Sequence, residues 1–163
     1  MKVLETIALK KYYGKDENKI KAVEGIDLKI DQGEFVAIVG TSGSGKSTLL
    51  HMMGGLDQPT DGKVFIDDEN IYDMNDENLT IFRRRKIGFV FQAYNLIPVL
   101  NVWENITLPT QLDLKVVNLL KLSVKKYHQT LVMVTHDEIL AQMADGMIRI
   151  EDGVVVNKGG ATC

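Results

Sequence analysis

A glycine-rich stretch that begins at residue 40 has the residue types needed to hold a chain of phosphates. It reads Gly40-Thr41-Ser42-Gly43-Ser44-Gly45-Lys46-Ser47-Thr48 and satisfies the pattern G-x-x-x-x-G-K-[ST]. Glycines permit a tight turn and let main-chain N–H groups face an anion without a Cβ in the way. Lys46 would supply a positive charge to the β and γ phosphates, and the Ser47 hydroxyl can ligate Mg²⁺.

The residues on either side of this stretch provide the structural context that such a site requires. The apolar run Phe35-Val36-Ala37-Ile38-Val39 predicts a strand buried on both faces, and a helix is expected over residues 46–53. The positive N-terminal end of that helix would point at the bound anion. We therefore expect a nucleoside triphosphate site built from Ser42, Gly43, Ser44, Gly45, Lys46, Ser47 and Thr48. The motif alone does not distinguish an ATPase, a GTPase or a small-molecule kinase.

Strands and helices are mixed along the rest of the chain. Strands are expected over residues 3–9, 26–30, 35–39, 63–67, 87–91, 130–135, 147–150 and 154–156, and helices over 46–53, 77–84 and 114–127. The strands over 35–39 and 130–135 are fully apolar, which predicts that both are buried. The last two strands flank Glu151-Asp152-Gly153, which is typical of a hairpin turn. This mixture predicts an α/β layered fold.

Composition argues against several other classes of protein. The 163 residues suffice for one domain with a buried core, and 45% apolar with 25% charged residues is average for globular proteins. A net charge of −3 gives no sign of a nucleic-acid binder. The one cysteine, Cys163, cannot form a disulfide within the chain. No signal peptide or membrane-spanning run is found, so we expect membrane contact only through a partner.

Further motifs resemble those of ABC (ATP-binding cassette) transporter ATP-binding subunits, in the family's order and over nearly the whole chain. They are the Q-loop-like Gly88-Phe89-Val90-Phe91-Gln92, the Thr135-His136-Asp137 that ends an apolar run, and the A-loop-like Lys11-Tyr12-Tyr13-Gly14. Residues 97–106, with Ile97-Pro98, Asn101-Val102 and Glu104-Asn105-Ile106, look most like the branch that serves lipoprotein release, macrolide export and bacterial cell division.

The resemblance implies a role for each matching residue. Tyr13 would stack on adenine, an interaction of about 1–3 kcal/mol in nucleic-acid binders, with Tyr12 as the rival for this role. Gln92 would coordinate Mg²⁺ or its water and carry a signal to the membrane partner. His136 would contact the γ phosphate and help to hold the attacking water. Lys46, Gln92 and His136 are then the catalytic candidates, and Ser47 and Gln92 the metal ligands.

The resemblance also implies an architecture and an activity. The fold would be a P-loop NTPase core with a parallel central sheet and an N-terminal antiparallel β-subdomain, in one ATP-binding domain over residues 1–163. Two copies would sandwich ATP and Mg²⁺ as a homodimer, and closure of the dimer would drive a transmembrane permease subunit. The chain would lie peripherally on the cytoplasmic face of the inner (plasma) membrane and hydrolyse ATP.

Two elements of the family pattern are absent between Gln92 and His136. One is the signature Leu-Ser-Gly-Gly-Gln, which caps the γ phosphate of the ATP held by the opposite subunit. The other is a buried strand ending in Asp-Glu, which supplies a metal-holding aspartate and a general base. The apolar-then-acidic residues 64–69 precede Gln92, where the family has an antiparallel strand of the outer sheet. The junction lies near residues 113–115, and most of the helical subdomain is missing.

Two explanations of this absence compete. Either the 163-residue sequence omits a segment that the protein contains, or the protein has lost the segment. We favour the first, because removal of a core strand would leave its neighbours without backbone partners. The corresponding functions are a complete ATPase and an ATP-binding module that cannot hydrolyse. A small-molecule kinase shares the phosphate loop but leaves Gln92 and His136 unexplained.

Overall fold

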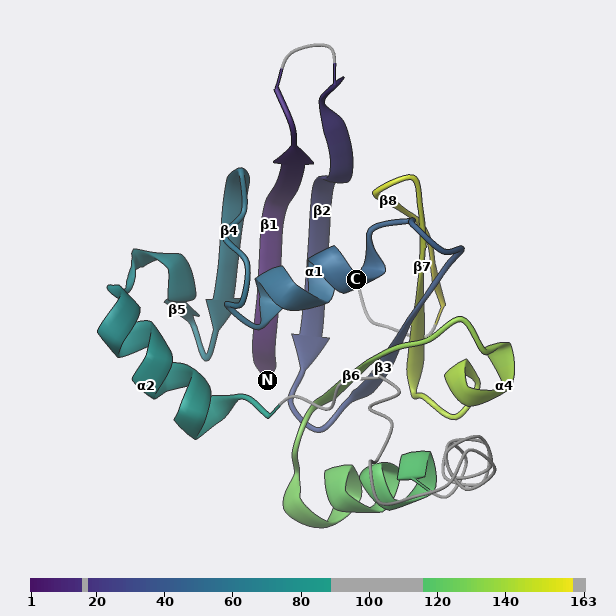
Figure 1. Cartoon of the computed structure of the whole chain (residues 1–163). Helices are drawn as coiled ribbons and strands as arrows, with labels where there is room; N and C mark the ends of the chain where they lie inside the picture. Colours follow the sequence, from purple (N-terminus) through teal and green to yellow (C-terminus); the bar gives the residue numbers. More distant parts are fainter. Residues whose placement is uncertain (16–17, 89–115, 160–163) are drawn as a thin grey trace, which may run out of the picture.

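A computed structural model of the chain describes residues 1–15, 18–88 and 116–159, which form two four-stranded sheets with helices between and beside them (Figure 1). This arrangement confirms the predicted α/β fold. Among the described helices, none has the length and apolar character needed to cross a bilayer.

The first sheet is antiparallel and has the order β2-β1-β4-β5. Its strands are β1 (Lys2–Tyr13), β2 (Ile20–Asp31), β4 (Asp61–Ile66) and β5 (Glu69–Asn70). β1 and β2 are longer than the apolar pattern predicts, because the pairs Tyr12↔Lys21 and Tyr13↔Ile20 continue the ladder through polar sequence. β4 pairs antiparallel with β1, which confirms that residues 64–69 do not belong to the parallel core.

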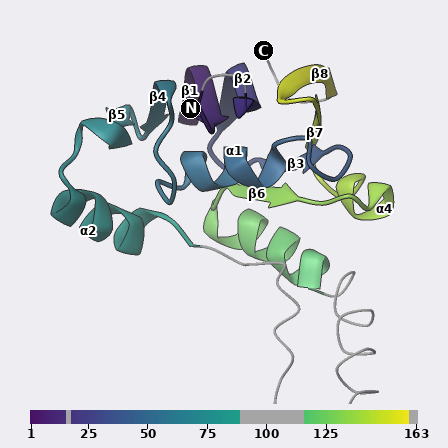
Figure 2. The same cartoon turned by 45° about the horizontal axis from the view of Figure 1, so that its top comes forward.

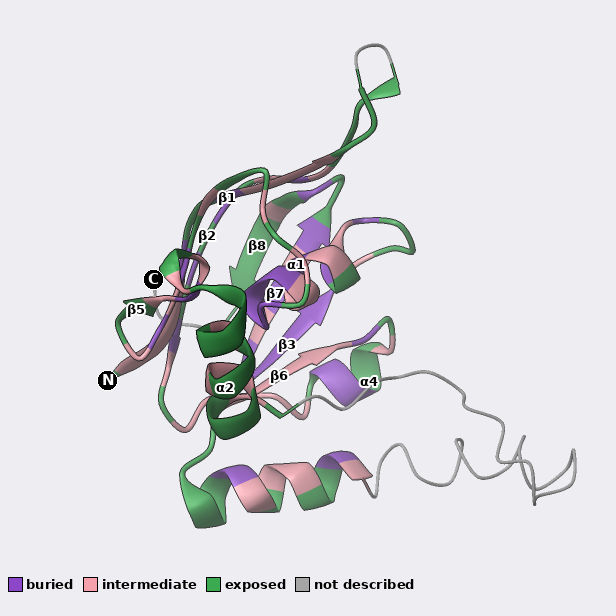
Figure 3. Ribbon diagram, turned by 60° about the vertical axis from the view of Figure 1, so that its left-hand side comes forward, coloured by how far each residue is buried: buried purple, intermediate pink, exposed green. Residues whose placement is uncertain are grey.

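The second sheet has the order β6-β3-β7-β8, with β3 at Phe35–Val39, β6 at Leu131–Val134, β7 at Gly146–Glu151 and β8 at Val154–Gly159. β3 pairs in parallel with β6 on one side and β7 on the other, and β8 returns antiparallel to β7. All five residues of β3 are buried, as the apolar run predicts (Figure 3). The two sheets are therefore the predicted parallel core and antiparallel β-subdomain.

β6 corrects the expectation that residues 130–135 form a strand buried on both faces. Each of its four residues is only half-buried. Within the described ranges, β3 is the single strand that pairs with β6, and the opposite edge of β6 has no strand beside it. The side chains of an edge strand keep partial contact with solvent even when the strand is apolar.

A second correction concerns the strand expected over residues 87–91. Ile87 has an extended backbone conformation directly after α2 (Asp76–Lys86), but neither Ile87 nor Gly88 pairs with a described strand. Residues 89–91 lie outside the described residues. An extended conformation becomes a strand only when a neighbouring strand accepts its hydrogen bonds.

Helices cover both faces of the parallel sheet (Figure 2). α1 (Lys46–Met53) lies between the two sheets, where Leu49 and Met52 share one core with residues of both. The helix over residues 116–127 and α4 (Glu138–Ala141) lie on the other face of the parallel sheet, against Phe35 and Ala37. Consecutive residues of β3 point to opposite faces, so one short strand anchors both layers.

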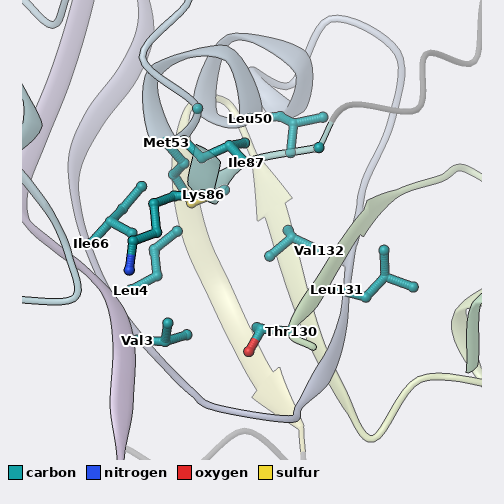
Figure 4. A pocket seen from close by; sticks show the side chains of 12 residues that line it. Val3, Leu4, Leu50, Met53, Ile66, Lys86, Ile87, Thr130, Leu131 and Val132 are labelled. Atoms are coloured by element: carbon teal, nitrogen blue, oxygen red, sulfur yellow. The ribbon is translucent and has the colours of Figure 1, made fainter. Parts of the chain in front are cut away.

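An apolar cavity of about 170 Å³ lies between α1, β1, β4 and β6 (Figure 4). Leu4, Met53, Ile66 and Val132 are among its lining residues, together with the polar Lys86 and Thr130. No residue of the glycine-rich stretch lines it. This cavity therefore opens to solvent beside the edge strand, and it is separate from the expected nucleotide site.

Candidate functional site

The glycine-rich loop connects the carboxyl end of β3 to the first turn of α1, as the motif requires. Gly40 and Gly45 have φ angles of 152° and 96°, in a region that L side chains rarely adopt. A Cβ on Gly45 would lie 2.1 Å from the carbonyl oxygen of Ala22, and one on Gly40 would lie 2.1 Å from that of Ile150. Both positions therefore require glycine, because their φ angles are positive and because the backbone of another segment leaves no room for a Cβ.

Two backbone hydrogen bonds hold the loop from the side. The N–H of Gly153, in the turn between β7 and β8, donates to the carbonyl of Ser44 at 3.1 Å. The carbonyl of Gly153 in turn accepts from the N–H of Glu24 on β2 at 2.8 Å. The predicted hairpin turn thus links the loop to the antiparallel sheet, a function that its local sequence does not indicate.

The loop leaves donors free for an anion at the start of α1. The N-cap residue is Gly45, and no side chain caps the helix. In the described part of the chain, the N–H groups of Lys46, Ser47 and Thr48 make no hydrogen bond. Unpaired first-turn N–H groups and the helix dipole together attract negative charge. Ser42, Gly43 and Ser47 are exposed, so solvent and ligands reach this end of the helix.

Lys46 is a nearly buried cation without a counter-ion among the described residues. Only 9% of it is exposed, and its ammonium donates to the carbonyl of Thr41 at 2.6 Å and to the Ser44 hydroxyl at 3.3 Å. Burial lowers the pKa of the Lys46 ammonium. A buried charge whose partners are all neutral is costly to keep, and an incoming anion relieves that cost.

Parallel pairing brings His136 to the same edge of the sheet as the loop. Ile38 of β3 is in register with Val134 of β6, and the N–H of Thr135 donates to the carbonyl of Ile38 at 3.1 Å. The next residue, His136, is exposed at the carboxyl end of β6, beside the strand that leads into the loop. Asp137 then caps α4 through its side chain. His136 and the phosphate loop therefore both follow the carboxyl ends of neighbouring strands, and the role of His136 stays a prediction.

The two candidate tyrosines of β1 face in different directions. The Tyr13 hydroxyl donates to Asp57 Oδ2 at 2.7 Å and lies beside Thr48 of α1. Burial and then the Asp57 carboxylate raise the pKa of Tyr13. The Tyr12 hydroxyl instead donates to Glu24 Oε1 on β2 at 2.6 Å. Of the two rings, Tyr13 is therefore the one on the side of the phosphate-loop helix.

Gln92 and the junction near residues 113–115 lie outside the described residues, so the predicted role of Gln92 stays a prediction. The residue that sequence reasoning missed is Asp57, in the loop after α1. In the sequence, two strands and a helix separate it from Tyr13, and no local motif indicates that the two residues are in contact. Tertiary contacts, which include the pairing of β1 with β4, bring these residues together.

Sequence comparisons relate the chain to one family of known proteins. A family model described as "ABC transporter" matches residues 23–151. An uncharacterized ABC transporter ATP-binding protein of Thermotoga maritima is 51% identical over 108 residues, which are 66% of this chain and 46% of that protein. The lipoprotein-releasing system ATP-binding protein LolD of Geobacter metallireducens is 45% identical over 107 residues, 66% of this chain and 48% of LolD.

Solved structures show the same fold. The dimeric structure of MJ0796, a cassette from Methanocaldococcus jannaschii, matches with a TM-score of 0.84 at 29% identity, over 98% of this chain and 99% of that chain. A post-hydrolysis state of the same cassette, bound to ADP and Pi, matches with a TM-score of 0.81 at 30% identity, over 98% and 99% of the two chains. By sequence, this chain spans about half the length of the curated relatives that it matches.

Proposed function

This chain belongs to the ABC transporter family, and from that membership we propose that it is the ATP-binding and ATP-hydrolysing subunit of a membrane transporter or a related membrane machine. One observation carries the proposal: the uncapped first turn of α1 and the buried Lys46 ammonium lie together at the carboxyl edge of the parallel sheet. Free main-chain donors with a fixed cation suit a polyphosphate.

The residues around the loop fit a nucleotide bound with Mg²⁺. Lys46 would turn from the carbonyl of Thr41 to the β and γ phosphates, while Ser42, Gly43, Ser44, Gly45 and Thr48 would surround the phosphate chain. The Ser47 hydroxyl would hold Mg²⁺ together with Gln92. There Mg²⁺ would supply positive charge that offsets the charge of the phosphates. Tyr13 would stack on the base, and His136 would contact the γ phosphate and hold the attacking water.

We further propose that two copies act as a homodimer and contact a transmembrane permease subunit on the cytoplasmic face of the membrane. The similarity to LolD of a lipoprotein-releasing system and to a cassette whose solved structure is dimeric supports this proposal. The signature segment that completes each site in the family is absent from the 163 residues. Productive pairing of two copies therefore depends on residues that this sequence lacks.

A second function, binding of ATP without hydrolysis, is favoured by the open edge of β6. The family pattern places the strand that ends in Asp-Glu between Gln92 and His136, and the sequence has none there. Within the described residues, β6 is also an edge strand of the core sheet. A chain without that strand has no acidic general base in the family's position, so it could hold Mg·ATP but not activate water efficiently.

Two measurements on the purified polypeptide separate these functions. An intact mass near 18.2 kDa would mean that the protein has only these 163 residues, whereas a larger mass would mean that it contains the missing segment. For the 18.2 kDa chain we expect Mg·ATP binding by calorimetry but no ATP turnover above background. Turnover by that chain that disappears in Lys46→Ala would refute the binding-only function. Absence of Mg·ATP binding in the wild-type chain would refute both functions.

A further inference from the structure

Asp57 occupies the centre of a small polar cluster on the side of β1 that faces α1. Its Oδ2 accepts the hydrogen bond from the Tyr13 hydroxyl at 2.7 Å, and its Oδ1 pairs with the Lys11 ammonium at 2.5 Å. Burial opposes ionisation of Asp57, but the Lys11 ammonium and the Tyr13 hydroxyl outweigh it and lower the pKa of the carboxyl. Both carboxylate oxygens are therefore engaged, and the carboxylate stays charged at neutral pH.

The backbone of Asp57 is itself anchored to the phosphate-loop helix. The Tyr72 hydroxyl lies 2.6 Å from both the carbonyl of Asp57 and the carbonyl of Met52 in the last turn of α1. Lys11 makes a second contact with the same loop, donating to the carbonyl of Gln58 at 2.6 Å. The first turn of α1 thus presents N–H donors for a phosphate chain. The loop that follows its last turn carries the carboxylate that holds Tyr13.

The cluster also determines which side of the Tyr13 ring is available. The Lys11 ammonium lies over the ring, 5.1 Å from its centroid, and occupies one face. Tyr13 as a whole residue is still 42% exposed. A flat ligand would therefore stack on the other face, and the hydrogen bond to Asp57 would limit rotation and tilt of the ring. A ring that is already ordered loses less conformational entropy when a base stacks on it.

We propose that Asp57 is a positioning residue for nucleotide recognition, which holds the Tyr13 ring through its hydroxyl so that one face is presented to a purine base. Lys11 supports this arrangement from the opposite side by neutralising the carboxylate and covering the other face. The inference rests on the proposed function, because it assumes that ATP binds at the phosphate loop with its base at Tyr13. It adds a residue in the loop after α1, distant from the glycine-rich motif, to the base-binding part of the site.

The test separates base binding from phosphate binding. Calorimetry would measure the affinity of the full chain for Mg·ATP and for Mg·tripolyphosphate, which has the phosphates but no base. In Tyr13→Phe and Asp57→Ala we expect ATP affinity to fall about threefold to tenfold, the worth of one hydrogen bond, while tripolyphosphate affinity changes less than about twofold. The double variant should fall no further than either single one, because both remove the same contact.

Two control variants complete the experiment. Asp57→Asn keeps an oxygen that can accept from Tyr13, so we expect it to retain most of the preference for ATP. Tyr12→Phe removes a hydrogen bond of the same kind, to Glu24, and should leave both affinities unchanged. The inference would be wrong if Tyr13→Phe and Asp57→Ala kept the wild-type preference for ATP over tripolyphosphate. It would also be wrong if the losses of ATP affinity in the two single variants added up in the double variant. In both cases the proposed function would still stand. If the wild type bound neither Mg·ATP nor Mg·tripolyphosphate, both the proposed function and this inference would be wrong.

Discussion

The N–H of Gly153 donates a hydrogen bond of 3.1 Å to the carbonyl of Ser44, so the turn between β7 and β8 supports the phosphate loop directly. Because Gly153 also bonds to Glu24 of β2, this one residue joins the loop to both sheets. Its φ of 78° suits glycine, and a Cβ there would lie 2.9 Å from the carbonyl oxygen of Ala22. The rigidity of the loop therefore depends on a residue outside the motif.

Gly153→Ala should lower both stability and nucleotide affinity. The left-handed conformation and the contact with Ala22 together should reduce the free energy of unfolding by about 2–3 kcal/mol. Gly33→Ala is the matched control, because Gly33 has a similar φ of 83° but no atom within 4 Å of the new Cβ. Its expected loss is about 1 kcal/mol. Urea unfolding checks both values, and equal losses in the two variants would contradict the proposed support by Gly153.

Lys46→Ala should abolish most Mg·ATP binding without unfolding the protein. Loss of a charge-assisted contact to phosphate should weaken binding by about 10-fold to 100-fold. In thermal unfolding, a Mg·ATP concentration that saturates the wild type should raise the Tm of the wild type and of Lys63→Ala clearly more than that of Lys46→Ala. Lys63 is an exposed lysine of β4 and serves as the charge-matched control. A full Tm shift in Lys46→Ala would show that the nucleotide binds elsewhere.

Tyr13→Ala should weaken ATP binding more than Tyr12→Ala. The Tyr13 hydroxyl lies beside Thr48 of α1, whereas the Tyr12 hydroxyl bonds to Glu24 on β2. Loss of base stacking should decrease affinity by about 1–3 kcal/mol for Tyr13→Ala. Calorimetric titration with Mg·ATP measures both variants. The reverse order would identify Tyr12 as the stacking ring.

The contribution of Asp57 to the free energy of unfolding should decrease as the pH falls. Its pKa is lowered in the folded state from an ordinary value of 3.8, so the stabilisation is present above 3.8 and is lost as the pH falls through the folded-state pKa. The free energy of unfolding of the wild type should therefore exceed that of Asp57→Asn at pH 7, and the difference should shrink below pH 4.

Asp68→Asn provides the comparison for this titration. Asp68 pairs with Lys2 at 3.4 Å, but its side chain is 74% exposed, and exposed ion pairs contribute little. Urea unfolding of the three proteins at several pH values between about 3 and 7 measures the differences. If the difference in the free energy of unfolding between wild type and Asp57→Asn stayed constant down to pH 3, ionisation of Asp57 would not stabilise the fold.

Local patterns in the sequence determined the central strand, the phosphate loop and the helix that follows it. β3 and α1 have the bounds that were predicted, because a continuous apolar run, a set of glycines and a helix start are each encoded by neighbouring residues. The placement of residues 64–69 in the antiparallel sheet was also predictable from their position before Gln92. The expected strand over residues 87–91 was wrong in its described part, since a strand needs a partner that its own residues do not specify.

Tertiary structure alone decided the contacts that surround the loop. The bond from Gly153 to Ser44, the bond from Tyr13 to Asp57 and the half-buried state of β6 each depend on which strands lie side by side and in what register. Periodicity within one segment shows which face of an element is apolar, but it carries no information about the partner across that face. The sequence therefore determined which residues could bind a phosphate chain, and the pairing of distant strands decided what holds those residues in position.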